Sequence, residues 1–280
     1  MPPALSALTR LAAPSLAVFA ISLLAPACPG SSNCPLRTDG GGARVVQVKG
    51  RVVDFETCLT MAGCRGMPGV TVGLLYNNGV YSAPTTDSGA FALTSVPDGA
   101  VHYLLVTDTN SGGEVLPTLQ ADPIRTSGGD LVSVELYGLK RTGGLYSGVS
   151  SEAGVDVQSH ALYLGQVLSV DGGKMKAIPD VQISVVPAAD IRYVNCIPSF
   201  SQCAGQTTLF ASRSTTGVFG EFVVISKSGA KDHVIWGASN QYSFSPLMVP
   251  LSPGYVTVGL HRSVGAAPPS ADAGLQPDYN

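Results

Sequence analysis

The chain has 280 residues, a length that suits two domains of about 100 residues each. Its hydrophobic content of 45% is too high for a disordered chain, although only 12% of its residues are charged. A formal net charge of −3, with no basic stripe and no acidic tail, argues against nucleic acid as a partner. The 33 glycines and 20 prolines, together with abundant Val, Thr and Ser, favour strands over helices.

The first 27 residues have the pattern of a signal peptide. A single basic residue, Arg10, precedes a short apolar run that ends in Ala25-Pro26-Ala27, a small-residue cleavage site. The run is shorter than the roughly 20 apolar residues of a membrane-spanning helix, and polar chain follows it directly. The sequence therefore predicts export.

Cys28 comes directly after this cleavage site. The stretch LAPAC resembles a bacterial lipobox, in which the cysteine becomes the lipid-modified first residue of the mature chain. Ala25 stands where that motif prefers leucine, and Leu24 lies one residue earlier. The resemblance implies a lipid anchor in a membrane. The alternative is ordinary cleavage followed by a disulfide between Cys28 and Cys34. In either case residues 28–44, which contain Gly and Ser, are expected to form a tether.

Residues 45–139 predict a first β-sandwich. Apolar and polar residues alternate from Val46 onward, which indicates a half-buried strand. Further strands are predicted within Met67–Tyr76, Val101–Val106 and Leu131–Gly138. Turns rich in Gly, Pro and Asn separate them at short intervals, as in sandwiches and barrels.

The second half repeats this order. Residues 140–160 are expected to form a linker, and residues 161–263 a second, more divergent sandwich. Strands at Leu162–Val170 and Val256–His261 open and close it. Residues 264–280 are expected to form a flexible tail. The predicted fold class is all-β, with two tandem Ig-like or transthyretin-like sandwiches of about seven strands each after the signal peptide.

Four cysteines lie in local pairs within the two halves. Cys58 and Cys64 are six residues apart, and Cys196 and Cys203 are seven apart. Spacing of this kind predicts two short-range disulfides in an oxidising compartment. Zinc is the alternative, but neither pair has the two-residue spacing of a metal knuckle and no histidine lies beside either pair. We therefore predict no metal site.

A short turn in the first half carries a resemblance to a known family. The order of strands around TTDSGAF is similar to that of carboxypeptidase regulatory-like domains, a branch of the transthyretin-like β-sandwiches. The residues that match the family's turn are Thr86, Asp87, Gly89 and Phe91, and Pro97-Asp98-Gly99 matches its following Pro-x-Gly turn. The resemblance implies a structural hairpin in which the glycine supplies a positive φ and the phenylalanine enters the core.

A second copy of the turn matches less completely. It carries Thr216, Gly220 and Phe222 but lacks the aspartate and the Pro-x-Gly turn. The resemblance covers most of residues 46–138 and, more loosely, residues 162–261. It implies an accessory module found in exported proteins, not the peptidase that gives the family its name.

The sequence offers no catalytic motif. It has no H-E-x-x-H metal motif, no G-x-S-x-G nucleophile elbow and no glycine loop that leads into a helix and could hold a phosphate. Transthyretin-like hydroxyisourate hydrolases end in Tyr-Arg-Gly-Ser, whereas this chain ends in Pro-Asp-Tyr-Asn. We therefore predict a non-enzymatic protein without a cofactor.

Three aromatic residues are the candidates for ligand binding. Trp236, Tyr242 and Tyr255 lie in the last third of the second half, and rings of this kind form stacking platforms for sugars. The alternative is that they are core residues or cross-strand pairs. The predicted function is a structural or binding module of the cell envelope, as an outer-membrane lipoprotein or a periplasmic protein, with a carbohydrate-binding module as the alternative. Its partners would be the membrane, through the lipid anchor, and a protein or glycan ligand.

The lipid anchor is directly testable. Metabolic labelling with a palmitate analogue should mark the wild-type chain and not the Cys28→Ala variant, because the cysteine carries the acyl groups. An unlabelled wild type would favour the alternative, ordinary cleavage and a Cys28–Cys34 disulfide.

Overall fold

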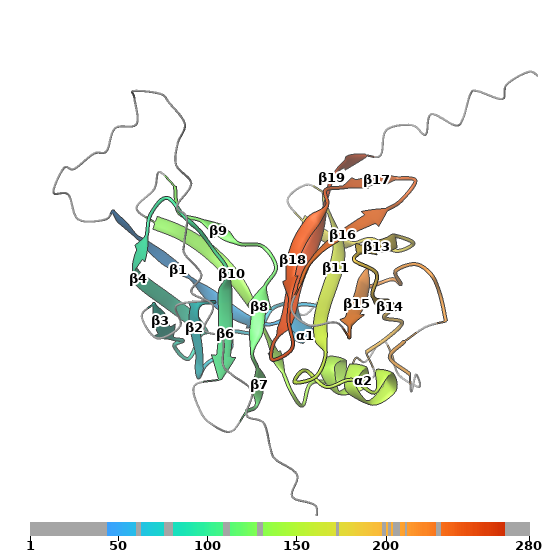
Figure 1. Ribbon diagram of the computed structural model, residues 1–280, viewed down its shortest axis with the longest axis horizontal. Helices are drawn as coiled ribbons and strands as arrows, with labels where there is room; N and C mark the ends of the chain where they lie inside the picture. Colours follow the sequence, from blue (N-terminus) through green and yellow to red (C-terminus); the bar gives the residue numbers. More distant parts are fainter. Residues whose placement is uncertain are drawn as a thin grey trace, which may run out of the picture. The chain divides into compact units, whose positions relative to one another are not determined.

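The computed structural model describes residues 44–59, 63–75, 81–108, 113–127, 131–171, 174–197, 200, 203, 208–210, 212–227 and 231–266. Within these ranges the chain is all-β, with 19 strands and two short helices (Figure 1). Gly42–Asn280 forms one compact unit. The predicted signal peptide, Cys28 and nearly all of the tether lie outside the described residues. The last strand runs to Ala266, three residues into the predicted tail.

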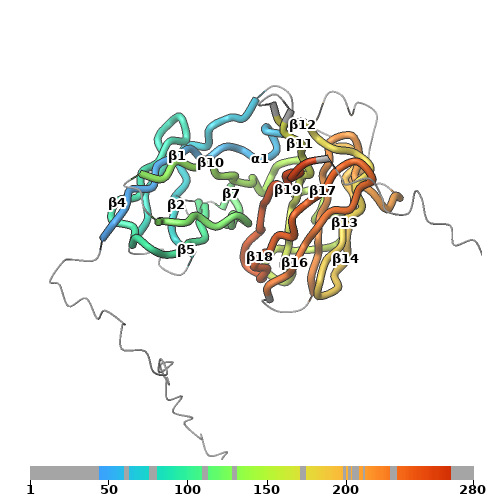
Figure 2. Tube along the Cα trace, turned by 90° about the horizontal axis from the view of Figure 1, so that it is seen from above, coloured from blue at the N-terminus to red at the C-terminus, as the bar shows by residue number. Residues whose placement is uncertain are grey.

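The first half is a two-sheet sandwich. Its strands are β1 (Val45–Asp54), β2 (Val70–Leu74), β3 (Ser82–Pro84), β4 (Ala90–Pro97), β5 (Val101–His102), β6 (Leu104–Asp108), β7 (Val115–Leu116), β8 (Thr118–Gln120), β9 (Ile124–Arg125) and β10 (Leu131–Lys140). One sheet has the order β4-β1-β10-β7, and β3, β2, β6 and β8 lie in the other. Strands β1 and β10 run side by side and pair in parallel (Figure 2).

The second half repeats this arrangement. Its strands are β11 (Ala161–Asp171), β12 (Lys174–Ala177), β13 (Gln182–Val186), β14 (Asp190–Tyr193), β15 (Glu221–Ser226), β16 (Lys231–Ala238), β17 (Tyr242–Phe244), β18 (Leu247–Leu251) and β19 (Val256–Ala266). Strand β11 pairs in parallel with β19 and antiparallel with β15, as β1 pairs with β10 and β4. Strands β13, β16 and β18 form the second sheet of this half.

Both copies of the predicted turn have the same backbone geometry. Gly89 and Gly220 adopt positive φ angles of 82° and 71°, where a side chain would be strained. Each glycine carbonyl accepts a hydrogen bond from the opening strand of its own half, from Val52 N at 2.8 Å and from Val167 N at 2.9 Å. The turn therefore has the same backbone role in both halves, where it leads into β4 and β15. In the first half it is not the predicted hairpin, because β3 before it pairs with β2 and β4 after it pairs with β1 in the other sheet.

The phenylalanines of the two turns also correspond. Phe91 pairs with Gly50 across β4 and β1, and Phe222 pairs with Gly165 across β15 and β11. A Cβ atom on either glycine would collide with the phenyl ring opposite it. Both rings are buried in the core of their own sandwich, which explains why a glycine lies at this point of each opening strand.

The sequence matched Thr86 of the first turn with Thr216 of the second, but the hydrogen bonds match a different pair. Thr85 Oγ1 donates to the carbonyl of Met67 at 2.8 Å, and Thr216 Oγ1 donates to the carbonyl of Ile178 at 2.9 Å. The structural equivalent of Thr216 is therefore Thr85 and not Thr86, which bonds within its own turn. Asp87 is exposed in this turn.

Three hydrophobic clusters form the core. The first lies inside the first sandwich and the second inside the second sandwich. The third covers the outer face of β11, β15 and β19, and includes Leu162, Leu164, Val223, Ile225 and Val258 from these strands. This sheet is therefore apolar on both faces.

The outer face is covered by two parts of the chain, and the sequence did not predict this role for either of them. Helix α2 (Gly144–Ala153) lies inside the segment predicted to be a linker and buries Leu145, Tyr146 and Val149. Cys196 and Cys203, which form a disulfide, belong to the same cluster together with Ile197 and Phe200. Burial of three such side chains stabilises the fold by about 1.5–3 kcal/mol each. Residues 140–160 therefore contribute five side chains to the core and do not form a free linker; these are Leu145, Tyr146, Val149, Val155 and Val157.

The N-terminus of α2 is capped from the first half. Glu56 belongs to the short helix α1 (Phe55–Cys58), and its carboxylate accepts hydrogen bonds from Gly144 N and Leu145 N, each at 3.1 Å. The helix's own N-cap residue, Gly143, provides no side-chain bond. An anion at this position accepts hydrogen bonds from the free N–H groups and interacts favourably with the positive end of the helix dipole. Glu56 thus holds α2 against α1.

We expect the Glu56→Ala variant to lose about 1–2 kcal/mol of unfolding free energy, because two amides of α2 lose their acceptor. Urea unfolding monitored by circular dichroism would measure the change. Glu114→Ala, which removes an exposed carboxylate elsewhere, is the matched control and should shift the unfolding free energy by less than about 0.5 kcal/mol. Equal stability of the two variants would contradict the capping role.

Candidate functional site

The two halves share one sheet through β8 and β19. These strands pair in parallel, with Val258 opposite Gln120, and Ala121 N donates to the carbonyl of Val258 at 2.8 Å. In a parallel ladder the next donor to β19 would come two residues later. Residue 123 is a proline and has no N–H, so the ladder ends there. Beyond this point the edge of β19 around Leu260 diverges from the first half.

The opposite wall of this opening is β10. The side-chain amide of Gln120 takes the place of a neighbouring strand: its Nε2 donates to Tyr137 O at 2.7 Å, and its Oε1 accepts from Tyr137 N at 2.9 Å. Further along β10, at Ser133 and Glu135, no described strand pairs with this edge. Gln120 therefore marks the closed end of a groove between two strand edges.

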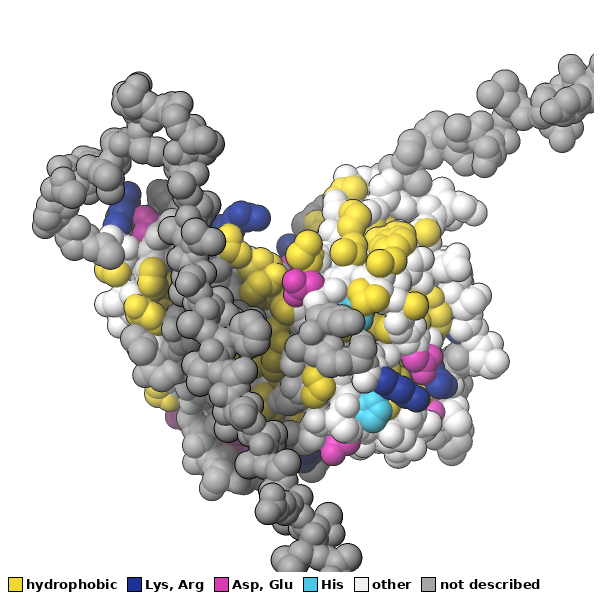
Figure 3. Space-filling view, viewed as in Figure 1, with side chains coloured by type: hydrophobic (Ala, Val, Ile, Leu, Met, Phe, Trp, Pro, Cys, Tyr) yellow, Lys and Arg dark blue, Asp and Glu magenta, His cyan; other side chains and the backbone are white. Residues whose placement is uncertain are grey.

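The groove has a volume of about 620 Å³. Figure 3 shows hydrophobic side chains gathered along a hollow on this face of the molecule. The residues that line the groove come from β10, β19, the chain after β8, the chain before β18, and β12: Ser133–Tyr137, Val258–Arg262, Gln120–Ile124, Ser245–Leu247 and Met175. Its size is within the range of small-ligand sites.

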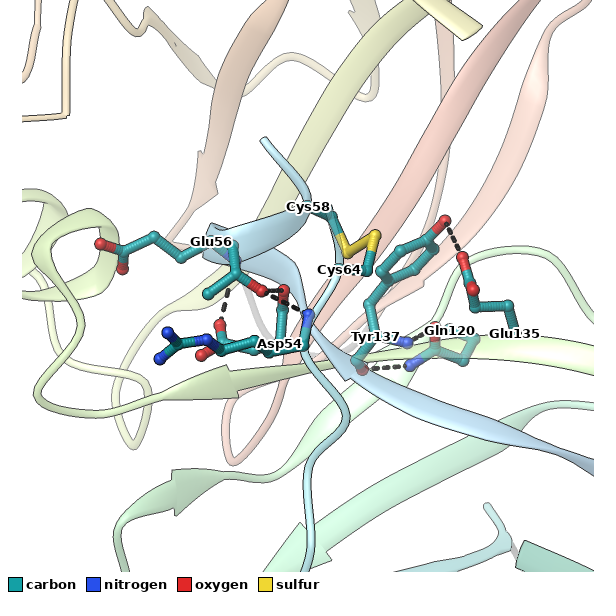
Figure 4. The surroundings of a disulfide bond; sticks show 9 residues. Asp54, Glu56, Cys58, Cys64, Gln120, Glu135 and Tyr137 are labelled. Atoms are coloured by element: carbon teal, nitrogen blue, oxygen red, sulfur yellow. Dashed lines mark hydrogen bonds between the residues drawn. A yellow bond between two sulfur atoms is a disulfide. The ribbon is translucent and has the colours of Figure 1, made fainter. Parts of the chain in front are cut away.

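A second, more apolar cavity of about 660 Å³ adjoins the groove, and the two share Glu135, Tyr137, Met175 and Leu260. The Cys58–Cys64 disulfide lies in its wall, and Figure 4 shows the Tyr137 ring beside these sulfurs, with Glu135 at its phenol end. The remaining lining residues are Phe55, Leu59, Gln166, Leu168, Lys176, Ala177, Val218 and Phe219. We call it the apolar cavity.

His261 lies at the inner side of the groove. It is 3% exposed, and its Nε2 is 2.7 Å from the hydroxyl of Tyr163. Burial lowers the pKa of His261 to about 4, and burial raises the pKa of Tyr163 well above its usual value, with a smaller contribution from the charge of Asp122. Both side chains are therefore neutral at neutral pH, and each supplies a partner for the other.

The charged side chains lie at the outer side of the groove. Asp122 and Arg262 both have exposed surface. Partial burial of its carboxyl group raises the pKa of Asp122, and the charge of Arg262 lowers it by a smaller amount. The hydroxyl of Tyr137 is 3.5 Å from Glu135 Oε1. Burial, followed by the charge of Glu135, raises the pKa of Tyr137 to about 12. The phenol is therefore a stable hydrogen-bond donor at neutral pH.

Glu221 is a buried carboxyl group next to the apolar cavity. It pairs with Gln166 across β15 and β11, and Gln166 Nε2 lies 3.4 Å from Glu221 Oε1. The other oxygen, Oε2, has no hydrogen-bond partner among the described residues. Burial raises the pKa of Glu221 to about 8, so the carboxyl is mostly protonated at neutral pH.

The three candidate aromatic residues do not form one surface. Tyr242 pairs with Ala266 at one end of β19, whereas Tyr255 precedes Val256 at the other end. Eleven residues of strand separate these ends by about 35 Å. Trp236 is half-buried and alternates along β16 with the buried Ile235. The structure therefore does not bring together the platform that the sequence suggested.

Of the four histidines, only His261 lines the groove. His102 pairs with Ile124 in the first half, and His233 is buried opposite Val249 in the second. Within the described residues no three His, Cys, Asp or Glu side chains lie close enough to hold a metal ion. No helix among the described residues is long and apolar enough to span a membrane.

Sequence reasoning missed the groove because its residues come from separate segments. Gln120, Asp122, Glu135 and Arg262 carry no motif, and their spacing along the chain is irregular. One local signal was available. Pro123 follows the short stretch 118–122, and a proline at that position ends pairing of the strand.

Comparisons with known proteins identify no family. No family model matches the chain, and no curated protein matches it. Among solved structures, a minor pilin of Streptococcus agalactiae is 15% identical over 80% of this chain and 98% of that chain, with a TM-score of 0.26. A shaft pilin of Lactobacillus rhamnosus GG is 9% identical (81% and 100% covered, TM-score 0.22). A family 26 carbohydrate-binding module from Eubacterium rectale, solved with maltoheptaose, is 9% identical (80% and 98% covered, TM-score 0.22). Likeness at this level assigns no function.

The raised pKa of Glu221 predicts a specific pH dependence of stability. The folded chain keeps a proton that the unfolded chain, with a carboxyl pKa near 4.5, releases, so stability should fall as the pH rises from about 4.5 to 8. Glu221→Gln should remove most of this loss, a few kcal/mol at pH 8, because an amide stays neutral. Urea unfolding at pH 5 and pH 8 would measure it, with Glu114→Gln as the exposed control. A wild-type slope in the Glu221→Gln variant would contradict the prediction.

Proposed function

We propose that this chain is a non-enzymatic binding module of a bacterial cell envelope, and that its ligand occupies the groove between β10 and β19. The observation that carries the proposal is the groove itself. It has the volume of a ligand site, it combines apolar walls with a few polar groups, and both halves of the chain contribute to it.

The chemistry of the groove supports binding over catalysis. His261, the residue type most suited to proton transfer near neutral pH, is buried, neutral and bonded to Tyr163. The phenol of Tyr137 holds its proton firmly. Asp122, Glu135 and Arg262 are therefore best suited to orienting a ligand through charge and hydrogen bonds.

The location in the cell envelope rests on the disulfides and on the N-terminal pattern. Cys58–Cys64 and Cys196–Cys203 both form disulfides, which persist in oxidising compartments. Together with the predicted signal peptide and lipid attachment at Cys28, they favour an outer-membrane lipoprotein or a periplasmic protein. The lipid would hold the module at a membrane, and the groove would remain available to a second partner.

The two sandwiches are, in this proposal, a fused pair of carboxypeptidase regulatory-like domains. The shared geometry of the Gly89 and Gly220 turns supports that relation. The carbohydrate-binding alternative is weaker, because Tyr242 and Tyr255 lie at opposite ends of β19 and cannot belong to one platform with Trp236. A glycan ligand would instead have to bind the groove, where Tyr137 is the only aromatic ring among the lining residues.

Co-sedimentation with isolated envelopes of the host bacterium tests this proposal. The full chain with Cys28→Ala would be used, so that the lipid makes no contribution. We expect it to sediment with the envelopes. Arg262→Glu should change binding by about ten-fold, because it reverses a charge that lines the groove: an acidic ligand would bind more weakly and a basic ligand more tightly.

Arg44→Glu is the matched control, since it reverses an exposed arginine that pairs with Asp98 outside the groove. It should bind as tightly as the parent chain. Equal binding by both charge variants, or no binding by the parent chain, would contradict the proposal. A glycan array run in parallel would show whether the bound component is a sugar.

A further inference from the structure

We propose that the partner in the groove is an extended peptide segment with a basic side chain, which adds a short parallel strand to the open edge of β19. This inference rests on the proposed function and names the chemical class of its ligand. Addition of a strand to an exposed sheet edge is a general mode of peptide recognition, in which backbone hydrogen bonds supply affinity and alternate side chains supply specificity.

The open edge of β19 has a defined length. The first part of this edge, Val256–Val258, pairs with β8. Strand β17 pairs with β19 from Ser263 onward. Between them lie four residues, which span about 13 Å of strand. On the other side of β19 the same residues pair with β11 as far as Arg262. This part of β19 is therefore firmly held on one side and open on the other.

Alternation along β19 identifies the groups that a new strand would meet. The backbone of Val256 and Val258 faces β8, because Val256 N donates to Pro117 O and Val258 O accepts from Ala121 N, both at 2.8 Å. N–H and C=O groups alternate sides along a strand. The backbone groups of Leu260 and Arg262 therefore face the groove.

The chain's own backbone does not complete this ladder. The strand that would continue β8 reaches Pro123 at the position where a donor to the Leu260 carbonyl is needed. An incoming segment can supply that donor. Since β8 and β19 are parallel, a segment that continues the pattern of β8 would run parallel to β19 and carry no proline at the paired positions.

The charges around this edge favour a basic segment. Asp122 and Glu135 lie on the side of the first half, and Arg262 is the one cation among the lining residues. His261 is neutral because it is buried. The groove thus has two carboxylates and one guanidinium, an excess of one negative charge that a Lys or Arg of the peptide would neutralise. The adjoining apolar cavity, which shares Leu260 with the groove, can receive an apolar side chain of the same segment.

A displayed library of random peptides, selected on the full chain with Cys28→Ala, provides the probe. Selected peptides should contain Lys or Arg, and the synthetic peptide should bind in calorimetry. On binding, the amides of Leu260 and Arg262 should become protected from hydrogen exchange. The amides of Gly259 and His261 should change little, because they already face β11.

Backbone methylation of the peptide gives a test that leaves the protein unchanged. N-methyl groups placed at alternate residues in one register should weaken binding by about ten-fold or more, and those in the other register much less, because only alternate N–H groups meet β19. Glu135→Lys in the protein should also weaken binding about ten-fold, whereas Glu114→Lys, the exposed control, should not.

The inference is overturned if the library yields no binding peptide, if both methylation registers have equal effects, or if Leu260 and Arg262 are not protected. In those cases the envelope test can still succeed. Sensitivity of envelope binding to Arg262→Glu would then support a groove ligand of another class, so the two proposals fail separately.

Discussion

The sheet formed by β11, β15 and β19 is apolar on both faces, and the rest of the structure depends on covering both. Tyr163 and Leu164 are neighbours in β11 and point to opposite sides, yet both are buried. All six residues of β15 are buried as well. Removal of apolar surface from water stabilises by about 25 cal/mol per Å², so neither face can be left exposed at small cost. Strands β13, β16 and β18 cover one face, and α2 covers the other together with Cys196, Ile197, Phe200 and Cys203.

This second covering is what joins the two halves. Phe55 in α1 and Leu59 directly after it pack into the same cluster as α2, and Glu56 between them caps α2. The pairing of β8 with β19 extends the sheet into the first half. The two sandwiches therefore share a sheet and a hydrophobic cluster and are not separate domains joined by a linker. The groove is a consequence of that fusion, because it opens where Pro123 ends the shared ladder.

The polar groups around the groove fall into two environments. Those that are fully buried are neutral: His261 and Tyr163 bond to each other, and Glu221 holds its proton. Asp122 and Arg262, by contrast, are exposed at the outer side. This separation follows from the high cost of burying an unpaired charge. It leaves the groove with open strand edges, a firmly protonated phenol and a few exposed charges, a combination suited to holding a ligand.

The sequence by itself determined the features that depend on nearby residues. Alternation predicted the strand from Val46, the repeated order of segments predicted the strand from Leu162, and local spacing predicted both disulfides. Only the tertiary structure decided the rest. Helix α2 contains two glycines and three serines, which favour helix weakly, and its cap comes from Glu56, 88 residues earlier in the chain. The pairing of β8 with β19 joins segments more than a hundred residues apart. Such contacts depend on the pairing register of the strands and on which apolar faces remain to be covered, and no local sequence pattern determines either.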